Sequence, residues 1–331
     1  ANMANLQLAF GCSANDRTEA LENGEIVPDG IDLDISTARI PRSLFDRFLF
    51  KGEFDLSEYG FYHQIQDVAA GRDEFVALPV FPSKSFRHRC IVVNRRSGIT
   101  EPRDLEGKTI GTPLWSQTAA IWIRGHLQDD YGVDLSTLSW VQGAVERTGT
   151  HGMPGLPDLL KPIDIRNAPA DRSLNDMLVA DEIDAVMGLP IPAALKTDPD
   201  IVPLFPDSGA VERDYYRRTG IHPIMHCIAI RRPVYEQNPW MAQSLYEAFC
   251  DARDWSLDRT RFVDVQRYML PWLHDSLDEI DEIFGGNPWP YGIDANRAAI
   301  ETLIRLMAEQ GMIARSMAPE DLFVAVDETR R

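Results

Sequence analysis

The chain has 331 residues, of which 44% are hydrophobic and 25% are charged, so its composition is that of a globular protein and excludes wholesale disorder. Its 33 basic residues stand against 51 acidic ones, which gives a formal net charge of −18. This balance argues against nucleic acid or an anionic membrane as the main partner, and the length favours two lobes over one.

Strands and helices alternate along the first part of the chain. Short apolar runs predict strands at 6–10, 31–35, 54–56, 90–93 and 109–111. A helix is predicted at 43–50, and a second at 119–131, where apolar residues recur every four positions and Gly132 suits the left-handed end. This alternation is typical of βαβ units and of a mostly parallel sheet.

The second half is less regular. Residues 149–172 are rich in glycine and proline and are predicted to form an irregular loop. A short helix at 173–180 and a strand at 183–188 follow. The tail is helical, with one helix capped by Asn238 with Pro239 at its first position, and another running from Asp294 to Gly311.

These elements predict an α/β protein of two lobes. We expect the first lobe to comprise 1–88 plus 233–331, including the helical tail, and the second to comprise 89–232. A ligand in such folds binds where strands end, so we expect it in a cleft between the lobes.

The cysteines and the first residues bear on the compartment. Four cysteines are present: Cys12, Cys90, Cys227 and Cys250. They form no C-x-x-C pair, which favours a reducing compartment over a disulfide framework. No apolar run approaches the roughly 18 residues of a membrane span, and residues 1–8 lack the pattern of a signal peptide. We therefore expect a cytoplasmic protein, although a cleaved signal peptide would leave no trace.

Three common nucleotide or hydrolase motifs are excluded. The GKT at 107–109 lacks the glycine that a phosphate loop needs five residues earlier, where Pro102 stands. The chain contains neither G-x-G-x-x-G nor G-x-S-x-G, which removes the dinucleotide fingerprint and the nucleophile elbow.

One basic run without any acid spans residues 83–97. Arg95 and Arg96 are expected on a solvated face. Arg87 and His88 fall at the predicted lobe junction, where a bidentate carboxylate clamp is useful. We therefore expect a positive cleft within a mostly negative surface.

A second anion site is predicted after Gly111, where a strand feeds a helix. The first turn of that helix offers unpaired backbone N–H groups at Ser116, Gln117 and Thr118. Arg124 lies two turns further along, and Trp115 offers a stacking face. The alternative is that Thr112 only caps the helix and that Trp115 belongs to the core.

Two further segments carry candidate site residues: Ser57 for substrate binding, and Glu58, His222 and His226 for proton transfer. Ser57 and Glu58 end a strand, and Glu58 either orients a histidine or donates a proton, or is a first-turn acid of a helix. His222 and His226 share one face of an extended segment. They are compatible with a metal, with catalysis or with simple hydrogen bonding, including a purely structural role.

The chain resembles the 4,5-dihydroxyphthalate decarboxylase family in seven ordered stretches. These are DLSEY at 55–59, PVFPSKSFRH at 79–88, DLEGKTIG at 104–111, TAAIWIRG at 118–125, HPIMH at 222–226, NPW at 238–240 and NPWPYG at 287–292. The resemblance spans residues 6–323. More distantly the chain is similar to type II periplasmic solute-binding proteins, which share a two-lobed fold with a ligand cleft between the lobes.

The resemblance implies a carboxy-lyase, an aromatic acid decarboxylase of phthalate degradation that works without an organic cofactor. Its motif positions here are Ser57, Glu58, Arg87, His88, Thr118, Arg124, His222 and His226. Lys84 stands where the family often has arginine, and Tyr59-Gly60 follows Glu58 where Leu-Ser is usual. The family reaction is therefore better supported than the family substrate.

The implied chemistry assigns roles to these residues. Ring protonation before loss of CO₂ needs an acid, a base and clamps for the remaining carboxylate. We expect clamps at Arg87 and Arg124, with the helix start at 116–118, and proton transfer by His88, His222 or His226, with Glu58 as orienter. A divalent metal held by these histidines and Glu58 is the alternative, although no ligand spacing demands it.

A protein of another class shares the expected fold. A solute-binding protein for a small anionic or aromatic carboxylate ligand of an ABC transporter needs clamps but no proton-transfer groups, so the three histidines favour the enzyme. The expected partner is a small aromatic carboxylate. A homo-oligomer is possible if Trp272, Trp289 and Tyr291 form a subunit contact; otherwise they are core.

Overall fold

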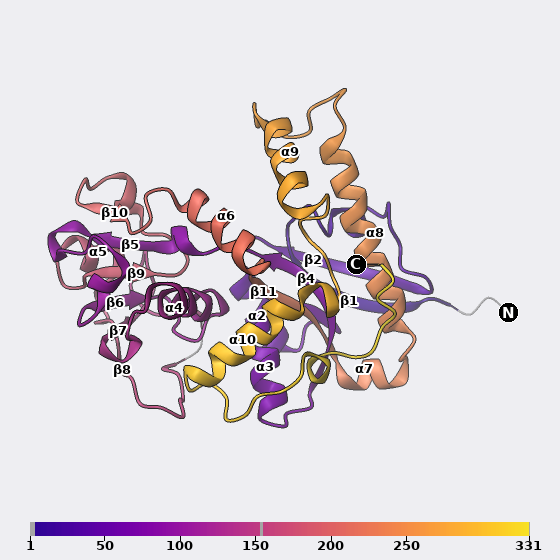
Figure 1. The fold of residues 1–331 in the computed structure, drawn as a ribbon. Coiled ribbons are helices and arrows are strands. Elements are labelled where there is room, and N and C mark those ends of the chain that lie inside the picture. The colour runs from indigo at the N-terminus through magenta and orange to yellow at the C-terminus, as the bar shows by residue number, and fades with distance from the viewer. Residues whose placement is uncertain (1–3, 153–154, 331) are drawn as a thin grey trace. The chain divides into compact units, whose positions relative to one another are not determined.

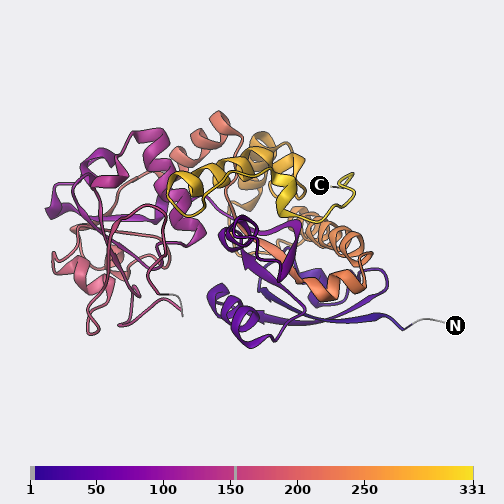
Figure 2. The ribbon, with the colours of Figure 1, turned by 90° about the horizontal axis from the view of Figure 1, so that it is seen from below.

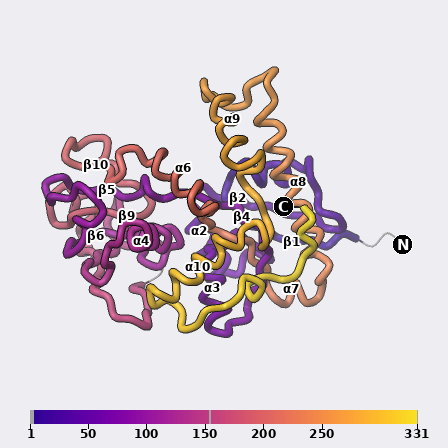
Figure 3. The backbone as a smooth tube through the Cα atoms, in the orientation of Figure 1, coloured from indigo at the N-terminus to yellow at the C-terminus, as the bar shows by residue number. Residues whose placement is uncertain are grey.

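The fold is described from a computed structural model that covers residues 4–152 and 155–330. The chain divides into two units. Figure 1 labels the helices and strands of both. Unit 1 comprises Ala1–Lys84, His226–Ile300 and Ala318–Arg331, and unit 2 comprises Ser85–Met225 and Glu301–Met317. Figure 3 traces the backbone, which returns to unit 1 for its C-terminal segment.

Unit 1 contains a five-stranded sheet in the order β2-β1-β3-β11-β4. Its strands are β1 Leu6–Ser13, β2 Ile31–Ala38, β3 Leu56–Gly60, β4 Phe75–Lys84 and β11 Ile224–Arg231. β1 pairs in parallel with β2 and β3, whereas β11 runs antiparallel to β3. β11 follows the return of the chain from unit 2 and is not part of a βαβ unit, so the parallel arrangement does not extend to it.

Unit 1 also contains six helices in the described residues. They are α1 Glu19–Glu22, α2 Pro41–Lys51, α3 Phe61–Ala69, α7 Arg232–Gln237, α8 Met241–Arg261 and α9 Leu273–Phe284. Of these, α2, α3, α7 and α8 contact its sheet. Phe10 of β1 meets Phe249 of α8 edge to face, with ring centroids 5.6 Å apart. Figure 2 shows the orange α8 beside the indigo strands of this unit. α2 has proline at its start and ends at Gly52, whose φ of 64° is left-handed.

Unit 2 contains a six-stranded sheet in the order β10-β5-β9-β6-β7-β8. Its strands are β5 Ile91–Asn94, β6 Thr109–Thr112, β7 Ser139–Gln142, β8 Asp164–Asn167, β9 Ala185–Met187 and β10 Ile201–Pro203. β6 pairs in parallel with β7 and β9, and β7 with β8. β5 is antiparallel to both β9 and β10.

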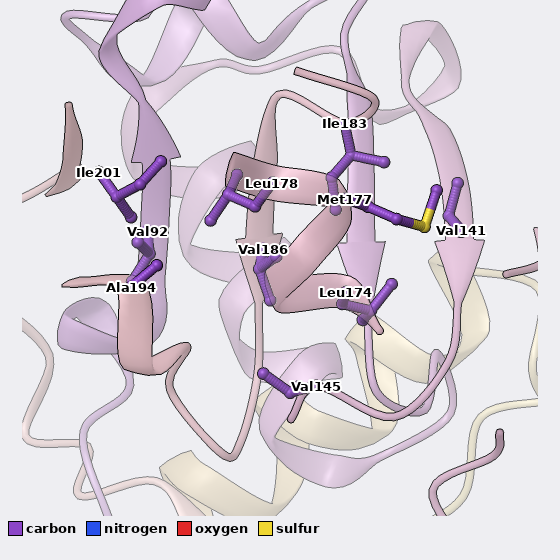
Figure 4. Close-up of a cluster of buried hydrophobic side chains, with 10 residues drawn as sticks. All are labelled: Val92, Val141, Val145, Leu174, Met177, Leu178, Ile183, Val186, Ala194 and Ile201. Carbon is purple, nitrogen blue, oxygen red and sulfur yellow. The ribbon is translucent and has the colours of Figure 1, made fainter. Parts of the chain in front are cut away.

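The helices of unit 2 are α4 Thr118–Tyr131, α5 Leu174–Val179 and α6 Ser208–Thr219. α5 packs its apolar side on the sheet. Figure 4 shows the resulting cluster of buried side chains: Val92, Val141, Val145, Leu174, Met177, Leu178, Ile183, Val186, Ala194 and Ile201. This cluster is an apolar core of unit 2, to which β7 contributes Val141.

The last helix, α10 Arg297–Glu309, begins in unit 1, and from Glu301 onward its residues belong to unit 2. Its Leu306 lies so close to α4 that a Cβ added to Gly125 would approach the Leu306 Cδ2 atom to 2.9 Å. Glycine at position 125 therefore permits this close packing. The predicted division kept 233–331 in one lobe, whereas the structure groups 301–317 with unit 2 because of contacts of this kind.

Several predicted elements are confirmed. The structure has the strands expected at 6–10 and 31–35, the helix at 43–50 and the helix that ends at Gly132, each within a few residues. The short helix at 173–180 is α5, for which Ser173 accepts a capping hydrogen bond from the Asp176 N–H. No helix in the described part of the chain is long and apolar enough to cross a membrane.

Other predictions were wrong in position or type. The strand expected at 54–56 begins at Leu56, and α8 begins at Met241 with Trp240, not Asn238, at its N-cap. The loop expected at 149–172 contains β8; Met153 and Pro154 within it lie outside the described residues. No strand was expected between 56 and 90, yet β4 lies there and includes Pro79 and Pro82; it tolerates proline because it is an edge strand.

Candidate functional site

Glu58 and His226 form a hydrogen-bonded dyad in unit 1. β3 and β11 pair antiparallel with Ile228 opposite Glu58 and His226 opposite Gly60. Glu58 and His226 are therefore diagonal neighbours on one face of the sheet, within reach of long side chains. The distance between His226 Nδ1 and Glu58 Oε1 is 2.5 Å. Two residues that are 168 positions apart in the chain are thus joined directly.

The other carboxylate oxygen of Glu58 is held by Ser13 at the end of β1. Glu58 Oε2 accepts hydrogen bonds from the Ser13 backbone N–H at 2.7 Å and from the Ser13 hydroxyl at 2.5 Å. The sequence had not indicated Ser13, because the parallel pairing of β1 with β3 was needed to bring it beside Glu58.

The ionisation state of Glu58 sets the tautomer of His226. Burial opposes the charge of Glu58, which is fully buried, but the hydrogen bond and charge of His226 and the Ser13 hydrogen bonds outweigh it, so the pKa of Glu58 is lowered. An ionised carboxylate only accepts hydrogen bonds, so His226 Nδ1 carries the proton and donates it. Nε2 is then the nitrogen that can accept or release a proton.

The neighbours of the dyad limit its freedom. The Phe45 ring meets the His226 ring edge to face, with centroids 5.0 Å apart, and the His226 side chain is 15% exposed. Ser57, also a predicted site residue, donates its hydroxyl to the Glu58 carbonyl oxygen instead of to the dyad. Alternation along β3 places the Ser57 and Glu58 side chains on opposite faces of the sheet.

Arg124 is the centre of a second group of polar side chains, in unit 2. Its Nε donates to Gln310 Oε1 at 2.8 Å, and its guanidinium lies 3.7 Å from the Trp115 ring centroid. Trp140 of β7 lies on the guanidinium as well, at 5.7 Å. Arg124 is only 1% exposed, yet its Nη1 and Nη2 atoms have no hydrogen-bond partner among the described residues.

Further unpaired polar atoms occur at the start of α4. Within the described residues, Trp115 Nε1, Thr112 Oγ1 and Gln117 Oε1 are buried without a hydrogen-bond partner. The Trp115 backbone N–H donates to Gln142 Oε1 at 2.8 Å. Gln117, not Thr112, is the N-cap residue of α4, so the alternative in which Thr112 caps the helix does not hold. Trp115 is buried and also stacks on Arg124, so the core and stacking interpretations both apply to it.

Arg87 and His88 have other neighbours in unit 2. Burial lowers the pKa of Arg87, opposed by Cys90, to which its side chain is hydrogen-bonded, and by the charge of Glu212. His88 stacks on His126 with ring centroids 4.3 Å apart, and burial, with a smaller effect of the Arg218 charge, lowers its pKa to about 4. The joint clamp expected from Arg87 and Arg124 therefore stays a prediction.

The three predicted histidines belong to three sets of neighbours. His226 is bonded to Glu58, His88 packs on His126, and His222 stacks on Phe86 with centroids 4.8 Å apart. Of the predicted site residues, the structure thus joins Glu58 with His226 and Trp115 with Arg124. α4 begins at Thr118, so Ser116 precedes its N-cap and does not lie in its first turn as expected. The Gln117 backbone N–H, expected to be unpaired, donates to the Leu114 carbonyl at 3.1 Å. The cleft expected between the lobes stays a prediction.

Lys84, where the family often has arginine, is buried in unit 1. Its Nζ donates to Asn296 Oδ1 at 2.5 Å and to the Pro290 carbonyl at 3.0 Å. Burial, with a smaller contribution from the charge of Arg253, lowers the pKa of Lys84 from 10.5 to about 7. Neither oxygen that accepts its protons carries a formal charge, so these contacts do not offset the cost of burying the ammonium.

The lowered pKa of Lys84 makes stability depend on pH. Between about pH 7 and 10 the unfolded chain holds a proton on Lys84 that the folded chain has lost, so raising the pH stabilises the fold by at most about 1.4 kcal/mol per pH unit. Below pH 7 both states are protonated and this dependence ends. We expect Lys84→Met to lose this rise, measured by urea unfolding at pH 7 and 9. Lys51→Met, at an exposed site, is the control; equal slopes in the two variants would contradict the prediction.

The fold defines the class of protein. The sulfonate-binding protein SsuA from Methylobacillus flagellatus is 14% identical, with a TM-score of 0.55 over 97% of this chain and 92% of that protein. The periplasmic aliphatic sulphonate-binding protein SsuA from Escherichia coli is also 14% identical, with a TM-score of 0.53 over 96% of this chain and 97% of that protein. The desulfurization enzyme DszB is 17% identical, with a TM-score of 0.50 over 97% of this chain and 96% of that protein. The chain therefore has the periplasmic-binding-protein fold, which proteins named as binding proteins and as an enzyme share.

Sequence relatives give the family. The 4,5-dihydroxyphthalate decarboxylase of Comamonas testosteroni is 31% identical over 322 residues, which is 97% of each chain. The protein of the same name from Pseudomonas putida is 34% identical over 217 residues, covering 65% of this chain and 83% of the relative. This chain belongs to the 4,5-dihydroxyphthalate decarboxylase family. A comparison with models of protein families found no match.

Proposed function

We propose that the protein removes one carboxylate, as CO₂, from a hydroxylated aromatic dicarboxylate such as 4,5-dihydroxyphthalate. The observation that carries this proposal is the Glu58–His226 dyad, in which a buried carboxylate fixes the ring of a histidine. A binding protein needs no such proton-transfer group, whereas a decarboxylase does. The family relationship supports the same reaction.

The reaction requires that the ring carbon bearing the leaving carboxylate be protonated. Loss of CO₂ without protonation would leave an electron pair in an aryl orbital. Deprotonating a hydroxyl para to that carbon pushes electron density to it, and the carbon then accepts a proton to give a dienone carboxylate. The bond to the carboxylate breaks, its electrons restore the aromatic ring, CO₂ leaves and the hydroxyl regains a proton. The net reaction consumes one proton and needs no oxidant.

His226 is the proposed proton carrier. With Nδ1 donating to Glu58, Nε2 exchanges the proton, and the imidazolium that forms is stabilised by the adjacent carboxylate. Ser13 keeps Glu58 in place by holding its other oxygen. His88 and His222 pack on other rings and are not needed for this step.

Arg124 is the proposed anchor for the carboxylate that stays on the ring. A buried guanidinium whose two terminal nitrogens find no partner in the part of the chain that the structure describes is costly unless an anion binds it. A carboxylate accepts from both nitrogens at once in the fork geometry of arginine. The Trp115 ring stacks on one face of the guanidinium. The N–H groups at the start of α4 add to the positive potential.

We propose that the reaction needs no cofactor or metal at the dyad. Both oxygens of Glu58 are already engaged, one by His226 and one by Ser13, so a metal would have to break these hydrogen bonds. The alternative function, binding of a small aromatic anion for transport, would use Arg124 and leave the dyad without a role.

Location and assembly are also proposed. The four cysteines are free and buried, which supports a reducing, cytoplasmic location. Between α8 and α9 several large apolar side chains are exposed, which supports a homo-oligomer: Phe262, Val263, Val265, Met269, Leu270 and Trp272. Tyr291 is instead fully buried, and Trp289 donates its indole N–H to the Phe81 carbonyl, so these two belong to unit 1.

One assay tests the proposed reaction. Purified protein is incubated with 4,5-dihydroxyphthalate, with single-hydroxyl analogues and with unsubstituted phthalate, and CO₂ release is followed with and without a chelator. We expect CO₂ from substrates with a hydroxyl para to a carboxylate, and binding without turnover for phthalate. Chelator should leave the rate unchanged. Tight binding of every compound with no CO₂ from any of them would refute the enzyme and favour the binding protein.

A further inference from the structure

Two imidazoles in unit 2 are buried with unpaired nitrogens. His88 is 1% exposed and His126 is 4% exposed. Both nitrogens of His88 and Nε2 of His126 have no hydrogen-bond partner among the described residues. Burying such a group unpaired costs about 1–3 kcal/mol each. Three unpaired ring nitrogens in one cluster therefore point to a ligand that binds there.

A carboxylate lies within reach of the same nitrogens. Asp130 follows His126 by four residues on α4, so both side chains project from one face of the helix. One ligand atom each from His88, His126 and Asp130 lie within 4.8 Å of one another. Two imidazoles and one carboxylate are a common ligand set for Zn²⁺ and related divalent ions.

We propose that His88, His126 and Asp130 form a binding site for a divalent cation of the Zn²⁺ type. The site is separate from the Glu58–His226 dyad, shares no ligand with it and has no part in the proposed proton transfer. Two imidazoles and a single carboxylate select Zn²⁺ or Co²⁺ over Mg²⁺ or Ca²⁺, which prefer an all-oxygen shell.

The two histidine rings are stacked, with an angle of 16° between their planes. Nitrogen lone pairs lie in the ring plane, so converging on one ion requires one ring to turn about its Cβ–Cγ bond. This torsion is broad and inexpensive. Tyr215 and Phe205 surround the rings, with the Tyr215 centroid 4.5 Å from His126 and the Phe205 centroid 5.6 Å from His88. Both imidazoles are thereby buried, whereas Asp130 is exposed, so an ion can reach the site from the side of Asp130.

Arg218 is the cation that now faces the carboxylate. Its Nη1 and Nη2 atoms lie 3.5 Å from the two oxygens of Asp130, at the limit of hydrogen bonding, while its Nε makes a closer contact of 2.7 Å with Asp214. Arg218 therefore competes weakly with a metal for Asp130. Because it keeps its stronger partner, it can release Asp130 when an ion binds.

Titration of the chelator-treated full chain with Zn²⁺, followed by calorimetry, tests the site. We expect one ion per chain, and binding weakened about tenfold or more by Asp130→Asn and by His126→Gln. Arg218→Gln should tighten binding, since it removes the competing cation. Co²⁺ should give a visible ligand-field spectrum that Asp130→Asn abolishes, and excess Mg²⁺ should not displace it.

His274→Gln is the matched control, because His274 is exposed on α9 in unit 1. Thermal unfolding without metal identifies any variant that has lost its fold, and Asp130→Asn preserves the shape of a surface side chain. Absence of Zn²⁺ binding, or binding that neither Asp130→Asn nor His126→Gln changes, would overturn the proposal. CO₂ release is not used in this test, so its outcome is independent of the proposed reaction.

Discussion

Replacing His226 with glutamine is expected to lower kcat for CO₂ release by about 10²–10⁴-fold, the usual contribution of a positioned acid–base group. Glutamine fills a similar volume and can hydrogen-bond Glu58, but it cannot carry a proton between substrate atoms. KM should change little, because His226 is not the proposed anchor. The measurement is steady-state CO₂ release over a range of substrate concentrations.

The dyad predicts losses of kcat of different size for substitutions at Glu58 and Ser13. Glu58→Gln should reduce kcat nearly as much, because the imidazolium loses its adjacent negative charge and Nδ1 loses an obligate acceptor. Ser13→Ala should reduce kcat less, since the Ser13 backbone N–H still holds Glu58. Ser43→Ala, at an exposed position of α2, is the matched control. A kcat within threefold of the wild type for both His226→Gln and Glu58→Gln would remove the dyad from the reaction.

Replacing Arg124 with methionine is expected to lower kcat/KM by roughly 10²–10³-fold, in line with the loss of one partner of a buried charge pair. Phthalate binding measured by calorimetry should weaken to a similar extent. Arg124→Lys should not restore it, because an ammonium cannot offer two parallel N–H groups while stacking on Trp115.

The free protein separates this role from a structural one. A buried guanidinium whose Nη1 and Nη2 have no hydrogen-bond partner among the described residues destabilises the folded state, so Arg124→Met should leave the thermal midpoint of the free protein unchanged or raise it. The rise in midpoint that phthalate gives the wild type should disappear in the variant. Arg172→Gln, at a surface ion pair with Glu182, is the control. Unchanged phthalate affinity in Arg124→Met would refute the anchor.

Local sequence patterns predicted well those helices and strands whose boundaries depend only on neighbouring residues. The four-residue apolar repeat and Gly132 located α4 within one residue, because a helix and its left-handed end depend on neighbouring residues. The same patterns failed for β4, where Pro79 and Pro82 obscured a strand that only its edge position allows. Whether a strand lies at an edge depends on distant partners.

In the candidate site too, the sequence predicted the kinds of residue, whereas their partners depend on the fold. Glu58 was predicted to orient a histidine, but three histidines were available, and only the pairing of β3 with β11 selects His226. Gln310, which binds the Arg124 Nε, comes from a segment 186 residues away that the sequence placed in the other lobe. His126 carried no signal at all, since it is one of many residues on a well-formed helix.

The sequence by itself determined the acidic balance, the α/β class, the family resemblance and the residue types able to do the chemistry, because composition and short motifs are properties of the chain alone. The tertiary structure decided which of those residues meet. The register between β3 and β11 brings Glu58 to His226, the end of β1 adds Ser13, and the fold of unit 2 brings Gln310 to the buried Arg124. Each of these contacts joins residues far apart in the chain, and a local sequence pattern does not determine which distant residue will lie beside a given one.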